Sequence, residues 1–189
     1  MGLNAITLTE LKKHLPCSIL AFGYPGGIEK VDLRGSTLEV VDLFQHEGME
    51  RVADLSLPQK FGEYDLVLDC GTTEHVANPA QAFLNAANTV KVGGRVMHHL
   101  PLTMVNHGYW NICPSFLADF YIGNGFEIER FDLTVHSDHW DADSQLPWDC
   151  DNPKSDLVVV PANSLILFVA RKVVLTAIRL PKCESKWVR

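Results

Sequence analysis

The chain has 189 residues, 47% of them hydrophobic and 21% charged, which is a typical composition for one globular domain with a sizeable core. Its formal net charge of -7 comes without a basic stripe, so we expect no nucleic-acid partner. The longest apolar stretch, 157–170, contains Pro161, Asn163 and Ser164, and it is too short and too interrupted to span a membrane.

The cysteines number five and show no paired spacing of the zinc-binding or disulfide kind. The first residues lack the basic start and apolar run of a secretory leader. We therefore expect free thiols in a cytoplasmic protein. Since no linker, repeat or low-complexity tract divides the chain, residues 1–189 are expected to form one domain.

Helical and strand patterns alternate along the chain from its beginning. A short helix is predicted over 7–15, where apolar residues recur at helical spacing until Pro16. A second segment, 28–36, is too short and too mixed for a long helix. Apolar runs predict buried strands at 18–23, 38–43, 51–54, 64–69 and 95–100.

Two more helices and two more strands complete the pattern. The helices are predicted over 79–90, ended by the pair Gly93–Gly94, and over 114–124. The strands at 126–133 and 165–174 are suited to antiparallel pairing across a long connection. This order predicts an α/β fold: a Rossmann-like, doubly wound, mostly parallel seven-stranded sheet with an antiparallel last strand.

The connection between the last two strands, 136–157, is a polar loop inserted into the single domain. We expect it to act as a flap on the substrate side, with Trp140 and Trp148 as apolar contacts. Its histidines and carboxylates match no metal-ligand spacing, so a solvated acidic loop is the preferred interpretation and no metal is predicted.

Residues that follow the predicted strands are the candidates for a ligand site, because doubly wound sheets bind ligands outside the carboxyl ends of their strands. Gly23 opens a glycine turn after the first strand, where backbone can approach a ligand closely. Asp42 ends the second strand about twenty residues later, the spacing at which a carboxylate reaches a ribose diol. Asp54 follows the third strand and is placed to accept from an adenine amino group. Either acid alone is as well explained as the cap of a turn.

The segment from Tyr64 to Gly94 carries the most specific motif. It reads Tyr-Asp-Leu-Val-Leu-Asp-Cys-Gly-Thr-Thr-Glu-His-Val-Ala-Asn-Pro, then an Ala-rich stretch, then Lys-Val-Gly-Gly-Arg-Val. This succession of buried strand, polar turn, helix and glycine break resembles the central segment of class I S-adenosylmethionine-dependent methyltransferases of type 11. The resemblance covers roughly 18–126. It implies S-adenosylmethionine as the cofactor and methyl transfer to a small molecule or a carbohydrate.

The resemblance also implies roles for individual residues. It places Asp42 on the ribose hydroxyls and Asp54 on the adenine. Further cofactor contacts implied are Gly23, Leu55, Cys70, Gly71 and Thr72. The chain departs from the family at the glycine turn, where Tyr24 and Pro25 follow Gly23. Since helix N-terminal amides normally help to bind the methionine carboxylate, we expect weak binding there or a homo-oligomer in which a second chain helps.

Histidines are concentrated where the reaction site is expected, and histidine suits the role of general base near neutral pH. His107 lies in a segment, Asn-His-Gly-Tyr-Trp-Asn, that resembles one found in methyltransferases of glycan and secondary-metabolite clusters. We favour His107 as the base and expect substrate contacts from Asn106, Tyr109 and Asn111. His75 is a further catalytic candidate, with a structural role at the helix start as its alternative.

His98 is the remaining catalytic candidate, and it neighbours His99 on the strand predicted at 95–100. Side chains alternate along a strand, so these two histidines cannot both face the site. An ordinary buried, hydrogen-bonded histidine is the alternative for either.

Two other classes of function stay open on this sequence. A non-catalytic methyltransferase-like scaffold would explain the altered glycine turn and would act through a protein partner. A nicotinamide-dependent Rossmann oxidoreductase uses the same geometry, but its G-x-G-x-x-G motif normally opens a long helix, which this chain lacks in the predicted pattern. A hydrolase is disfavoured because no G-x-S-x-G motif is present.

Overall fold

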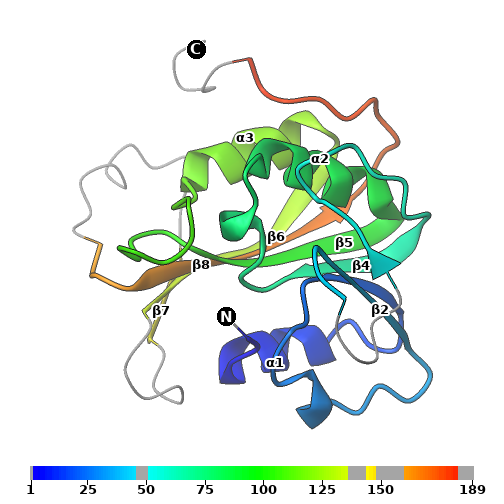
Figure 1. Ribbon diagram of the computed structural model, residues 1–189, viewed down its shortest axis with the longest axis horizontal. Helices are drawn as coiled ribbons and strands as arrows, with labels where there is room; N and C mark the ends of the chain where they lie inside the picture. Colours follow the sequence, from blue (N-terminus) through cyan, green and yellow to red (C-terminus); the bar gives the residue numbers. More distant parts are fainter. Residues whose placement is uncertain (1, 46–50, 136–143, 148–159, 183–189) are drawn as a thin grey trace.

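The computed structural model describes residues 2–45, 51–135, 144–147 and 160–182. Its centre is one sheet with the strand order β3-β2-β1-β4-β5-β8-β6-β7 (Figure 1). The parallel half contains β1 (Ser18–Phe22), β2 (Thr37–Asp42), β3 (Arg51–Val52), β4 (Tyr64–Asp69) and β5 (Val90–Pro101). The other half contains β8 (Ser164–Lys172), β6 (Phe126–Val135) and β7 (Ser144–Pro147).

The predicted sheet is confirmed, including its antiparallel last strand. β8 lies between β5 and β6 and is antiparallel to both. The structure adds an eighth strand, β7, which pairs with β6. β7 lies inside the segment 136–157, which was expected to be only a loop. Backbone hydrogen bonds are enough to form such a short edge strand, so its sequence carries no apolar alternation to predict it.

Helices cover both faces of the sheet (Figure 1). α2 (Pro79–Thr89) and α3 (Pro114–Gly123) lie on one face, and α1 (Ala5–Lys12) lies on the other. Side chains along β1 alternate accordingly: Leu20 belongs to the core cluster on the α2 and α3 side, and Ile19 belongs to the cluster on the α1 side. In the described part of the chain, no helix has both the length and the hydropathy that crossing a bilayer requires.

α1 begins earlier than predicted because Asn4 caps it. The Asn4 side chain accepts from Thr7 N at 2.9 Å, and Thr7 Oγ1 accepts from Asn4 N at 2.7 Å. These reciprocal bonds satisfy amides that the first turn of a helix leaves without partners. The helix therefore starts at Ala5, before the first residue of the predicted range.

The glycine pair after α2 has another role than the predicted one. α2 ends at Thr89, and Gly93 and Gly94 lie inside β5. The register between β4 and β5 shifts after Tyr64, and Gly93 has a left-handed φ of 90° at this irregularity. A Cβ on Gly94 would lie 2.7 Å from Asp65 O, so the close approach of the two strands requires a glycine there.

The connection after β1 contains one helical turn, η1 (Ile28–Lys30). This agrees with the prediction that the segment is too short for a long helix. The N-terminal segment lies against the glycine turn: Leu3 N donates to Gly26 O at 2.6 Å, and Gly2 forms a bridge with Gly26. A Cβ on Gly2 would lie 2.5 Å from Gly26 O. A glycine at position 2 is therefore needed for these backbones to pass so closely.

Candidate functional site

A pocket of about 330 Å³ opens at the carboxyl ends of β2, β3 and β4. Of the residues predicted from the sequence, it is lined by Asp42, Asp54, Leu55, Thr72, His75 and Tyr109. The chain leaves β1 toward β2 on one side and returns to β4 on the other, so the pocket lies at the switch in strand order. Its volume is in the range of small-molecule sites.

Asp42 ends β2 at the edge of the pocket. Its Oδ1 accepts from Leu43 N at 2.6 Å and from Phe44 N at 3.4 Å. The side chain of Phe44 is exposed and lines the pocket beside it. Asp42 thus caps a turn and also presents a carboxylate next to an apolar ring, so the two interpretations from the sequence are compatible.

Asp54 begins the turn after β3, the strand beside β2, and it also lines the pocket. Its Oδ1 accepts from Ser56 N at 2.8 Å and from Ser56 Oγ at 2.5 Å. These hydrogen bonds lower the pKa of Asp54, which keeps it ionised at neutral pH. Neither of these two bonds uses Oδ2.

The loop that carries Asp54 and Leu55 is held by Asn85 of α2, a residue that the sequence did not point out. Asn85 Nδ2 donates to Leu55 O at 3.1 Å and to Leu57 O at 2.9 Å. Its Oδ1 accepts from Gln59 N at 3.1 Å. Asn85 is buried on the face of α2 that otherwise carries apolar residues. A polar residue within the apolar face of the predicted helix was the signal that the sequence offered.

Other predicted cofactor contacts lie apart from the pocket lining. Gly23 adjoins Thr72, and a Cβ on Gly23 would lie 2.4 Å from Thr72 Oγ1, which donates to Phe22 O at 2.6 Å. Gly71 follows β4 with a left-handed φ of 88°. Cys70 is buried in the cluster on the α1 side, and burial raises the pKa of its thiol well above the usual range.

His98 is enclosed in the core between β5 and α3. Its Nδ1 lies 2.9 Å from Asp69 Oδ2 and its Nε2 lies 2.5 Å from Tyr121 OH, and all three side chains are buried. His99 points to the other face, where its Nε2 lies 3.1 Å from Thr134 Oγ1. His98 therefore corresponds to the buried histidine given as its alternative, because both ring nitrogens are engaged away from the pocket.

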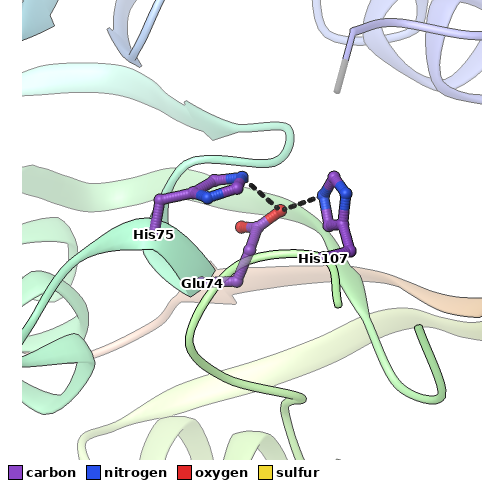
Figure 2. A group of neighbouring side chains, drawn as sticks. All are labelled: Glu74, His75 and His107. Carbon is purple, nitrogen blue, oxygen red and sulfur yellow. Dashed lines mark ion pairs between the residues drawn. The ribbon is translucent and has the colours of Figure 1, made fainter. Parts of the chain in front are cut away.

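Three side chains meet beside the pocket: Glu74, His75 and His107 (Figure 2). Glu74 and His75 belong to η2 (Thr73–His75), directly after β4. Glu74 Oε1 lies 3.4 Å from His107 Nε2 and 3.8 Å from His75 Nε2. Figure 2 shows both imidazoles pointing toward the carboxylate. The side chain of Glu74 is 0% exposed, and its two oxygens have no hydrogen bond to any residue that the structure describes.

The environment of Glu74 favours its neutral form. Burial and the charge of Asp69 raise the pKa of Glu74 to about 8. His75 has a lowered pKa because burial disfavours the imidazolium. Glu74 and His75 thus both have perturbed pKa values where they meet His107, which marks the cluster as a candidate reaction site.

The loop after β5 is held on η2 and carries His107 to this position. Tyr109 N and Trp110 N donate to Glu74 O at 2.8 Å and 3.2 Å. A Cβ on Gly108 would lie 2.8 Å from Glu74 Cγ, and Gly108 has a left-handed φ of 70°. Only a glycine fits between His107 and Tyr109 with this backbone, so the motif is explained by the close approach of loop and η2.

The predicted substrate contacts lie on the same loop. Tyr109 is 75% exposed and lines the pocket. Asn106 is exposed and has a left-handed φ of 61°. Asn111 Oδ1 accepts from Met104 N at 3.0 Å, so this side chain stabilises the loop itself. Trp140 and Trp148, predicted to form a flap, lie outside the described residues.

Comparison with known proteins finds likeness in structure alone. No protein-family model matches the chain, and no curated protein matches its sequence. Among solved structures, TehB from Haemophilus influenzae is similar with a TM-score of 0.61 and 13% identity. That match covers 90% of this chain, and this chain spans 62% of the length of TehB.

Two further structures were solved with S-adenosylhomocysteine. The 1,6-didemethyltoxoflavin-N1-methyltransferase of Burkholderia thailandensis has a TM-score of 0.59 and 16% identity, over 90% of this chain and 78% of that one. The N-methyltransferase NodS of Bradyrhizobium japonicum has a TM-score of 0.56 and 10% identity, over 89% and 88%. The fold is therefore that of the class I S-adenosylmethionine-dependent methyltransferases, as the sequence motif implied.

Proposed function

We propose that this protein is an S-adenosylmethionine-dependent methyltransferase that acts on a small molecule or a carbohydrate. The observation that carries the proposal is the pocket at the switch in strand order, with Asp42 and Asp54 on its walls. Solved neighbours of the same fold that hold S-adenosylhomocysteine support this cofactor class.

The residues present fit the nucleoside half of such a cofactor. Asp42 offers a carboxylate to the ribose hydroxyls, and Asp54 keeps an oxygen, Oδ2, that its bonds to Ser56 do not use. Leu55 and Phe44 supply apolar contact for a planar base. Thr72 and His75 line the β4 side of the pocket and are the proposed contacts beyond the ribose.

A bound cofactor would supply a methyl group on a sulfonium, which an in-line nucleophile accepts at carbon while S-adenosylhomocysteine leaves. For a hydroxyl acceptor, His107 is the proposed base that removes the proton. Glu74 Oε1 lies 3.4 Å from His107 Nε2, so this carboxyl group is the proposed positioning partner of the imidazole. Tyr109 presents an exposed ring at the pocket, where we expect the acceptor to bind.

The deciding experiment is a calorimetric titration with S-adenosylhomocysteine, using NADH as the control ligand. Micromolar binding of the first and none of the second is expected. Asp42→Ala should weaken that binding about 10–100-fold, since ribose hydroxyls would lose a charged acceptor. Asp32→Ala, in the exposed Asp32–Arg34 ion pair, is the matched control and should bind normally. Unchanged affinity in Asp42→Ala would remove Asp42 from the site.

A scaffold without catalytic activity is the second candidate, and the glycine turn favours it. The turn leads into the single turn η1, and the N-terminal segment packs against Gly26. Thr72 Oγ1 also lies over Gly23. This candidate predicts no binding of S-adenosylhomocysteine. Restored binding in a dimeric fraction only would indicate instead that a second copy of the chain completes the site.

A further inference from the structure

The cluster beside the pocket has the donor atoms of a metal site. One carboxylate oxygen of Glu74 and one ring nitrogen each of His75 and His107 lie within 4.8 Å of one another. Two imidazoles and one carboxylate suit Zn²⁺ and related divalent transition metals, whereas Mg²⁺ and Ca²⁺ prefer oxygen ligands alone.

The distances fit an ion placed between the three atoms. Zn²⁺ binds nitrogen and oxygen at about 2.0–2.2 Å, so two of its ligands in a tetrahedral arrangement lie about 3.4 Å apart. Glu74 Oε1 lies 3.4 Å from His107 Nε2 and 3.8 Å from His75 Nε2. Small rotations of the two rings would close the set, and the His75 side chain is 49% exposed and has room to rotate.

The carboxyl group at the centre of the cluster is buried beside two imidazole rings. The Glu74 side chain is 0% exposed, and within the described part of the chain neither of its oxygens receives a hydrogen bond. Buried carboxylates are usually paired, hydrogen-bonded or bound to a metal. The loop residues Tyr109 and Trp110 bind the backbone oxygen of Glu74 and leave its side chain aimed between the two imidazoles (Figure 2).

We propose that Glu74, His75 and His107 bind one divalent transition-metal ion, Zn²⁺ in the first instance, at the wall of the pocket. Three protein ligands leave at least one coordination position for water or substrate, as in catalytic zinc sites. His75 lines the pocket, so that open position faces the space where the acceptor is expected.

The consequence for chemistry rests on the proposed methyl transfer. An ion bound at His107 Nε2, the nitrogen that faces Glu74, would leave the other ring nitrogen protonated. His107 would then no longer be the base, and the ion would activate an acceptor hydroxyl in its place. The ion would lower the pKa of an acceptor hydroxyl bound to it, and the proton would pass to solvent. The oxygen would then attack the methyl carbon as the carbon–sulfur bond breaks and S-adenosylhomocysteine leaves. His107 is a ligand in this state and a base in the metal-free state.

The test uses the full chain without a histidine tag, freed of metal with EDTA and dialysed. Titration with Co²⁺ should produce visible d–d absorption bands that saturate at one ion per chain, and Zn²⁺ should abolish them by competition. Glu74→Gln and His107→Ala should each weaken Zn²⁺ binding at least about tenfold. His14→Ala removes a histidine on the α1 side, paired with Glu10, and should bind Zn²⁺ as the wild type does.

The outcomes separate this inference from the proposed function. Absence of one-to-one binding, or equal Zn²⁺ affinity in wild type, Glu74→Gln and His107→Ala, overturns the metal site. His75→Ala, at an exposed position, serves as the third ligand variant where another fails to fold. Titration with S-adenosylhomocysteine in EDTA tests the cofactor pocket independently, so either proposal can fail while the other stands.

Discussion

Asn85→Ala should loosen the loop that forms one wall of the pocket, although Asn85 itself does not line the pocket. The substitution removes the partners of Leu55 O, Leu57 O and Gln59 N. Each hydrogen bond contributes about 1 kcal/mol net, and alanine returns roughly 0.5 kcal/mol through its better helix propensity. The free energy of unfolding should therefore fall by about 2–3 kcal/mol. Because the same loop carries Asp54, affinity for S-adenosylhomocysteine should fall about tenfold as well.

Urea unfolding followed by circular dichroism measures the first effect, and calorimetric titration measures the second. Asn88→Ala is the matched control on the same helix, because Asn88 is exposed and its side chain donates to Leu84 O one turn back. It should change stability by less than about 0.5 kcal/mol. Equal stability of the Asn85→Ala and Asn88→Ala variants would refute the reasoning that the buried amide holds the loop.

Three further variants probe the buried groups around the site. Glu74 has a folded pKa of about 8 against a usual 4.5, so the folded state keeps a proton that the unfolded state loses in this range. In EDTA, the contribution of Glu74 to the free energy of unfolding should fall by roughly 4–5 kcal/mol from pH 4.5 to 8 and stay level above. Urea unfolding of the wild type and of Glu74→Gln measures this contribution as the difference between their two pH dependences, and equal pH dependences would contradict the assignment. Tyr121→Phe leaves a nitrogen of His98 unpaired and should cost about 1–3 kcal/mol in thermal unfolding, without changing affinity for S-adenosylhomocysteine. Gly108→Ala, strained at φ 70° and too close to Glu74, should displace the loop and lower Zn²⁺ affinity in the Co²⁺ competition assay, whereas Gly123→Ala meets no atom and should not.

Much of the fold could be predicted because its strands are buried on both faces. β4 has the predicted bounds, Tyr64–Asp69, because a short apolar run between polar turns is typical of a buried strand. The error at Gly93–Gly94 has a physical cause: a glycine pair suits a helix end and a strand irregularity equally, and only the neighbouring strand decides. β7 was missed because an edge strand depends on backbone pairing with β6.

The site was predictable where it depends on topology. Asp42 and Asp54 line the pocket because the ends of parallel strands meet at one edge of a sheet. The importance of Glu74 could not be read from the sequence, because a loop about 35 residues later in the chain packs on it and binds its backbone oxygen. Asn85 was missed for the same reason, since its partners belong to the connection after β3.

The position of β8 governs the order in which this protein can assemble. It is the last described strand in the chain, yet it fills the slot between β5 and β6 and pairs with both. A growing polypeptide therefore exposes two unsatisfied strand edges until residues 164–172 have been synthesised. Nascent chains stalled before that point should recruit chaperones or aggregate, and final folding should be slow because it closes long-range pairings.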